Sequence, residues 1–172
     1  MLAERIDGVN KDMRNRLLSL LEENARYSVE ELALMLGSDA ETVAAEMAEL
    51  HKDGIIRGYT ALINWDKVDN THVTAIIELK VTPQPDAGFE DIAERVMGFE
   101  HVESVYLMSG GYDLCVIVKG RSFQEIAMFV AKRLATIAGV VSTATHFILR
   151  TYKDNGIEIQ DTKLDDRENV SF

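Results

Sequence analysis

A short run of five residues, SGGYD at positions 109–113, has side chains and backbone groups that could bind a small zwitterion. Glycine lets a carboxylate approach backbone N–H groups closely, and the carboxylate of Asp113 could accept a hydrogen bond from an α-amino group. The same run also has a structural interpretation, since paired glycines are typical of two-residue hairpin turns that need a positive φ. The spacing by itself favours the hairpin turn.

Catalytic and metal-binding patterns are absent from the sequence. The four histidines (His51, His72, His101 and His146) are spread over predicted helix, strand and loop without paired ligand spacing. Cys115, the only cysteine, lies in an apolar stretch where a buried thiol is expected. The chain has no phosphate-cradling loop, dinucleotide fingerprint or nucleophile elbow. The sequence therefore predicts a protein that is not an enzyme and that needs no cofactor and no metal.

Apolar spacing near the N-terminus predicts three helices. Between residues 6 and 21 apolar side chains recur every three or four positions, which is typical of a helix with one buried face. The capping-box pattern Ser-x-x-Glu occurs at 28–31 and again at 38–41, where it opens a second and a third helix. Gly54 fits the left-handed residue that ends the third helix. The tight turn between the last two helices predicts a helix-turn-helix.

The third predicted helix, residues 40–52, would enter the major groove if this unit binds DNA, so its outward side chains matter. The pattern leaves exposed Glu41, Thr42, Ala44, Ala45, Glu46, Ala48, Glu49, His51 and Lys52. Residues 1–58 together carry seven basic and twelve acidic side chains. Because carboxylates repel DNA phosphates, this charge predicts weak DNA binding by a single unit. The most suitable phosphate contacts are Arg14, Arg16, Arg26 and Arg57.

The second half of the chain alternates strands and helices in the order β, α, β, β, α, β. Strand patterns cover residues 72–82, 102–109, 112–119 and 140–153. Helical patterns run from Phe89 to Val96 and onward from Ser122, which fits an N-cap. This order is that of the split βαβ, or ferredoxin-like, sandwich, in which two helices cover one face of the sheet. Apolar groups such as Ile76 also lie on the other face, which we expect to pair with a second copy of the chain.

These patterns together predict an α+β chain with two domains. The predicted divisions are a helix-turn-helix with a wing over 1–58, a connecting strand and linker over 59–70, a ferredoxin-like oligomerisation domain over 71–153, and a polar C-terminal tail over 154–172. Residues 55–64 have the β-branched and aromatic content of a wing or connecting strand.

Composition sets the broad class of protein. A hydrophobic fraction of 47% with 27% charged residues is typical of a globular chain. The longest uncharged apolar run, 135–144, is shorter than the roughly 20 residues that a membrane span needs, and the first residues lack the apolar core of a signal peptide. We therefore expect a cytoplasmic protein with no membrane partner. The formal net charge of −11 is unusual for a DNA-binding protein, which relies on basic patches.

The chain resembles the Lrp/AsnC (leucine-responsive/asparagine regulator) family of transcription regulators over residues 6–152. The segments that carry the resemblance are LLSLLEENARYSVEELALMLG, LHKDGIIRGYTALIN, SGGYDLCVIVKG and VVSTATHFILRTY. The resemblance implies that residues 1–58 are a winged helix-turn-helix that binds DNA and that residues 71–153 are a ferredoxin-like (RAM-type) effector and oligomerisation domain that senses an amino acid. It also implies homodimers that pair their sheets and assemble into octamers or larger rings.

Site residues follow from this resemblance as expectations. The effector is expected at an interface between dimers, in contact with Ser109, Gly110, Gly111, Tyr112, Asp113, Ser142, Thr143 and Thr145. DNA is expected to contact Arg14, Arg26, Ser38, Thr42, Ala45, Glu46, Glu49, Lys52 and Arg57. The hydroxyls of the last strand could bond the ligand, but they are also typical of a solvent-facing strand. Relatives that bind DNA usually have basic side chains where this chain has Ala44, Ala45 and Glu46.

Two alternatives stay open. The helix-turn-helix could serve as a folded spacer or a protein-docking surface, so that the chain acts as a ligand sensor through partner proteins. Sirohaem decarboxylases also resemble these regulators and hold a tetrapyrrole in the second domain. That site needs clustered histidine and arginine, and only His146 and Arg150 meet this need, four residues apart on one predicted strand face.

Overall fold

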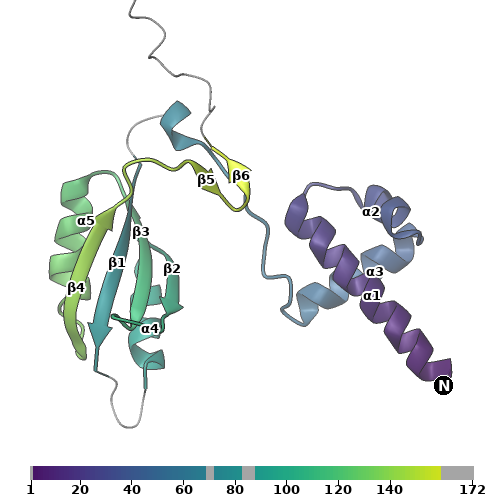
Figure 1. The fold of residues 1–172 in the computed structure, drawn as a ribbon, viewed down its shortest axis with the longest axis horizontal. Coiled ribbons are helices and arrows are strands. Elements are labelled where there is room, and N and C mark those ends of the chain that lie inside the picture. The colour runs from purple at the N-terminus through teal and green to yellow at the C-terminus, as the bar shows by residue number, and fades with distance from the viewer. Residues whose placement is uncertain (1, 69–71, 83–87, 160–172) are drawn as a thin grey trace, which may run out of the picture. The chain divides into compact units, whose positions relative to one another are not determined.

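The computed structural model describes residues 2–68, 72–82 and 88–159, with side chains described from residue 11 onward. The chain divides into two compact units, Met1–Ala61 and Leu62–Phe172 (Figure 1). Each unit has its own cluster of buried apolar side chains. The two units are therefore described separately.

Three helices form the first unit, as the sequence predicts: α1 (Leu2–Glu23), α2 (Val29–Leu36) and α3 (Ala40–Lys52). The capping box of α2 is confirmed, because the Ser28 hydroxyl accepts from the Glu31 N–H while the Glu31 carboxylate accepts from the Ser28 N–H. The three helices enclose a core in which Leu17, Leu32, Val43 and Leu50 are fully buried. This core holds the turn between α2 and α3 in place.

α3 covers residues 40–52 as predicted, but its N-cap lies one residue later than predicted. Its N-cap is Asp39, whose carboxylate accepts hydrogen bonds from the N–H and the hydroxyl of Thr42, both at 2.8 Å. These two bonds hold the pKa of Asp39 below its usual value. The capping box predicted at 38–41 is therefore wrong. Aspartate caps a helix as well as serine does, and the turn that Gly37 makes at φ 66° leaves Ser38 outside the helix.

The end of the helical unit agrees with the sequence only in part. Gly54 adopts the predicted left-handed conformation, with φ 69°. The strand predicted for residues 55–64 is wrong, because none of these residues pairs with another strand in the described part of the chain. A short 3₁₀ turn, η1 (Trp65–Lys67), follows.

The second unit is a four-stranded sheet covered by helices (Figure 1). Its elements are β1 (Val73–Val81), α4 (Glu90–Met97), β2 (Val102–Leu107), β3 (Leu114–Gly120), α5 (Phe123–Phe129), the π-helical turn η2 (Val130–Leu134) and β4 (Val140–Phe147). The strand order is β2-β3-β1-β4 and every neighbouring pair is antiparallel. The predicted α+β ferredoxin-like fold is thereby confirmed.

The two faces of the sheet differ in what covers them. On β1 the alternate residues Ala75, Ile77 and Leu79 are fully buried in one apolar cluster with α4 and α5, so both helices cover the same face. The residues between them, among them Ile76 and Glu78, lie on the opposite face and are only partly buried. We call this second side the open face of the sheet.

The C-terminal part differs from the prediction of one long strand followed by a tail. β4 ends at Phe147, and two short strands, β5 (Lys153–Asp154) and β6 (Ile157–Glu158), form a separate hairpin. Asn155 and Gly156 turn this hairpin with positive φ angles of 43° and 80°, which is the Asn-Gly signal of a tight hairpin that the sequence prediction missed. The rest of the predicted tail, residues 160–172, lies outside the described residues.

Candidate functional site

The SGGYD run lies in a loop between β2 and β3 that is wider than predicted. The Met108 N–H donates to the Asp113 carbonyl over 2.8 Å, so four residues separate this pair instead of two. Of the two glycines only Gly110 has a positive φ, at 147°. The predicted two-residue turn is therefore wrong, and Ser109, Gly110 and Gly111 are exposed on a broader loop.

Asp113 fastens this loop to β1. Its N–H donates to the Leu79 carbonyl at 3.0 Å, and its carboxylate accepts from the Val81 N–H at 2.9 Å and lies 3.4 Å from the Lys80 ammonium. The pairing of β1 with β4 shifts register between Lys80 and Val81, which leaves the Val81 N–H available. Each of its carboxylate oxygens thus has a partner on β1, so Asp113 positions the loop.

A cavity of about 450 Å³ lies beside the loop on the sheet. The residues that line it come from β1, the loop and β4: Glu78, Lys80, Gly111, Tyr112, Ser142, Thr143 and Ala144. Four of the residues predicted to contact an effector thus meet at one cavity. The other four, Ser109, Gly110, Asp113 and Thr145, do not line it.

Alternation along β4 explains why its three predicted hydroxyls do not act together. The register pairs Ser142 with Lys80, Thr143 with Leu79 and Thr145 with Ile77. Directly paired residues on neighbouring strands point to the same face. Ser142 therefore shares the open face with Lys80, whereas the side chains of Thr143 and Thr145 lie on the face that the helices cover.

Glu78 is a candidate site residue that the sequence prediction missed, as is Lys80, since both line the cavity. Its carboxylate lies 3.5 Å from Nε2 of His146 on β4 and close to the Tyr112 phenol. Partial burial raises the pKa of Tyr112, and the negative charge of Glu78 raises it further. Burial likewise raises the pKa of Cys115, again with a contribution from Glu78. A carboxylate thus stands beside the cavity, next to the ammonium of Lys80. In the sequence, the only feature that Glu78 and Lys80 share is their position on the polar side of β1.

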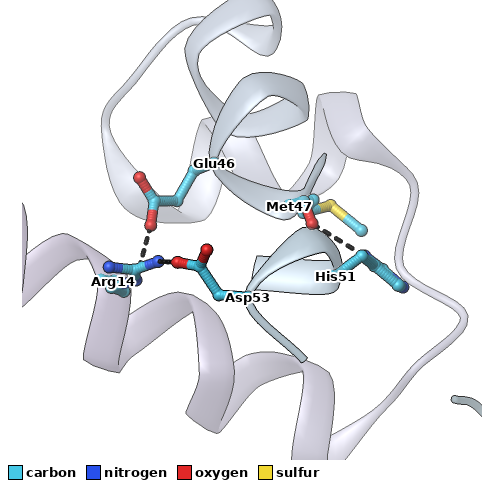
Figure 2. Close-up of polar contacts among 5 residues, drawn as sticks. All are labelled: Arg14, Glu46, Met47, His51 and Asp53. Atoms are coloured by element: carbon cyan, nitrogen blue, oxygen red, sulfur yellow. Dashed lines mark hydrogen bonds and ion pairs between the residues drawn. The ribbon is translucent and has the colours of Figure 1, made fainter. Parts of the chain in front are cut away.

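In the helical unit, α3 exposes most of the predicted surface. Glu41, Thr42, Ala45, Glu49 and Lys52 are exposed, and so are Arg26 and Arg57 outside the helix, whereas Ser38 is half-buried. The prediction that Glu46 is exposed is wrong, because Glu46 is only 9% exposed and pairs with Arg14 of α1 (Figure 2). The helix period turns Glu46 toward α1, where Arg14 compensates its charge.

The remaining candidate chemistry finds no support in the geometry. Arg150 follows the end of β4 at Phe147, so the predicted placement of His146 and Arg150 on one strand face is wrong. No three histidine, cysteine, aspartate or glutamate residues come together as a metal site within residues 2–68, 72–82 and 88–159. In these same parts of the chain no helix is both long and apolar enough to cross a membrane.

Comparison with known proteins adds two matches to family models. Residues 12–57 match a winged helix-turn-helix DNA-binding domain, and residues 74–157 match the Lrp/AsnC ligand-binding domain. The HTH-type transcriptional regulator YugG of Bacillus subtilis is 44% identical over 160 residues, which are 92% of this chain and 96% of YugG.

Two solved structures are similar over most of the chain. The feast or famine regulatory protein of M. tuberculosis in complex with L-methionine has a TM-score of 0.70 at 26% identity, over 87% of this chain and 98% of that one. A transcriptional regulator of Neisseria meningitidis in complex with L-methionine has a TM-score of 0.67 at 25% identity, over 83% and 91% of the two chains.

Proposed function

Because the chain belongs to the Lrp/AsnC family of transcription regulators, we propose that it binds DNA through the α1–α3 unit and senses an amino acid at the cavity beside loop 108–113. The observation that carries this proposal is the presence of both domains in one chain, a winged helix-turn-helix at 12–57 and the ligand-binding domain at 74–157. Each domain contributes one half of the function.

The polar lining of the cavity suits the two charged groups of an α-amino acid. The Glu78 carboxylate provides an acceptor for the α-ammonium group, and the Lys80 ammonium, 3.4 Å from Asp113, provides a cation for the α-carboxylate. Gly111 has no side chain to shield its backbone from the ligand. L-methionine in the two related structures supports a ligand of this class.

A homodimer is the assembly that the open face supports. Ile76 and Ile117 are directly paired there at the centre of the sheet, and Tyr106 is 53% exposed nearby. A second copy laid on this face would remove these apolar groups from water. Dimers would then assemble into an octamer or a similar ring, with the effector bound between dimers, as the family resemblance implies.

Oligomerisation also compensates for the acidic DNA-binding unit. Glu41 and Glu49 are exposed on α3, so a single unit is expected to hold DNA weakly. Once one helix-turn-helix unit of a ring has bound DNA, the other units of that ring are held close to the same DNA. Their local concentration is then high, so the ring binds more tightly than a single unit. The same acidic helix favours a second candidate, a ligand sensor that acts through protein partners without binding DNA.

A thermal-shift screen of the full-length protein with the twenty amino acids tests the sensing half. At a hundred times its dissociation constant, the effector is expected to stabilise the protein by about 2.7 kcal/mol, and a few chemically related amino acids should share the effect. If none of the twenty raises the melting temperature, the protein does not sense an amino acid. Glycerol at matched concentration controls for non-specific stabilisation.

A further inference from the structure

Arg14 of α1 lies between two carboxylates that belong to α3 and its C-terminal end (Figure 2). Its Nε is 2.8 Å from Oε1 of Glu46, and its Nη2 donates to Oδ2 of Asp53 over 3.4 Å. Glu46 lies in the middle of α3 and Asp53 is the residue that ends it. One guanidinium group therefore joins α1 to the recognition helix at two points, about two helical turns apart.

Burial makes the pair of Arg14 and Glu46 interdependent. The Glu46 side chain is 10% exposed, and both Nε of Arg14 and Oε1 of Glu46 are shielded from solvent. The two atoms form an ion pair by distance, but neither makes a hydrogen bond with the other or with any other described residue. Removal of Arg14 would leave Glu46 as a buried charge without compensation, which is strongly unfavourable, whereas Arg14 is 32% exposed and also faces Asp53.

Apolar packing alone does not fix how α3 is rotated. Leu17, Val43 and Leu50 press α3 onto α1, but apolar contact has little directional preference. The ion pairs restrict this rotation, because Glu46 and Asp53 must both stay within reach of one guanidinium group and a buried Glu46 that turned away from it would lose its compensating charge. Glu41, Ala45, Ala48 and Lys52 follow one another along the side of α3 opposite its buried residues, so a small rotation would move this whole row.

We infer that Arg14 is a positioning residue, which holds the recognition helix in the orientation that DNA docking needs, and not a phosphate contact. The inference rests on the proposed DNA binding. Two edges of the guanidinium group face protein carboxylates, and the charge that a phosphate would need is already compensated by Glu46. The phosphate contacts must then come from exposed cations such as Arg26, Lys52 and Arg57.

The test compares single and paired apolar replacements in the full-length protein, with a duplex selected by the wild type from a random-sequence pool. Arg14→Met is expected to weaken DNA binding at least tenfold while the slope of log K against log salt stays unchanged. The double variant Arg14→Met/Glu46→Met removes the buried charge as well and should recover to within about threefold of the wild type, since apolar side chains replace buried ion pairs well. Arg26→Met is the matched control, and its slope should fall by about one unit because it removes a phosphate contact.

The opposite pattern overturns the inference. If Arg14→Met lowers the salt slope by about one unit and the double variant stays as weak as the single one, Arg14 contacts phosphate.

Amide hydrogen exchange in α3 gives a readout without DNA: exchange should speed up in Arg14→Met and return to the wild-type rate in the double variant. Should the wild type bind no duplex at low salt, the DNA-binding proposal fails, and the exchange rates still decide whether Arg14 holds α3. Unchanged exchange in Arg14→Met would refute that role.

Discussion

Replacing Glu78 by glutamine is expected to remove most of the thermal response to the amino-acid effector. Glutamine keeps the size of the side chain but not the negative charge that receives the α-ammonium group. Loss of one partner from such a charge pair costs about 2 kcal/mol or more, which is at least thirtyfold in the dissociation constant. At the ligand concentration that stabilises the wild type by about 2.7 kcal/mol, the variant should gain less than about 1 kcal/mol.

Glu103→Gln is the matched control for this variant. Glu103 lies on β2 of the same sheet, pairs with Lys119 at 2.6 Å and does not line the cavity. It should keep the full thermal response. An equal loss of response in both variants, or a full response in Glu78→Gln, would show that Glu78 does not bind the effector.

Removing the two exposed carboxylates of α3 is expected to tighten DNA binding. In Glu41→Gln/Glu49→Gln, the surface that enters the major groove loses two negative charges near phosphates. Repulsion between one carboxylate and a phosphate a few ångströms away costs roughly 0.5–1 kcal/mol of binding free energy in a water-like medium. Affinity for a random-sequence duplex should therefore rise about tenfold at low salt. The gain should shrink as salt is added, because exposed charges are screened. Fluorescence anisotropy with a labelled duplex measures both effects.

The control for this variant has the same change in net charge on another helix. Glu22 and Glu23 are exposed at the C-terminal end of α1, so Glu22→Gln/Glu23→Gln reports the effect of overall charge alone. It should change affinity by less than about twofold. If the α1 variant gains as much as the α3 variant, or if the α3 variant gains nothing, then α3 is not the surface that faces DNA.

The local signals in the sequence predicted the fold well where they were strong. Ser28 with Glu31 and Gly54 mark the helix ends where the sequence indicated them. Alternation along 72–82 separated the buried from the open side of β1 correctly. These features depend on one helix turn or one strand, so they are visible in the order of residues.

Features that depend on neighbouring elements were harder to predict. Glu46 looks like a surface residue until α1 brings Arg14 against it. The Asp113 carboxylate looks available until the register shift in β1 presents the Val81 N–H to it. In both cases a partner distant in sequence satisfies the charge. The residue order shows both members of each pair, but it does not show that folding brings them into contact.

In the candidate site, too, local features were predicted and features that depend on strand pairing were not. The sequence pointed to the loop and to β4, and Gly111, Tyr112, Ser142 and Thr143 do meet at one cavity. It missed Glu78 and Lys80, because their place beside that cavity depends on the pairing of β1 with β3 and β4. Charged residues on the polar side of a strand are usually solvated, so nothing local distinguished these two.

The most direct test of the account is the salt dependence of DNA binding by the full-length wild-type protein. Fluorescence anisotropy with labelled genomic fragments, titrated at several salt concentrations, gives the observed binding constant at each one. We predict measurable binding at low salt that falls linearly in a plot of log K against log salt, as the release of counterions from phosphates requires. Absence of binding to every fragment at the lowest salt would contradict DNA binding and leave the sensor that acts through protein partners as the function of this chain.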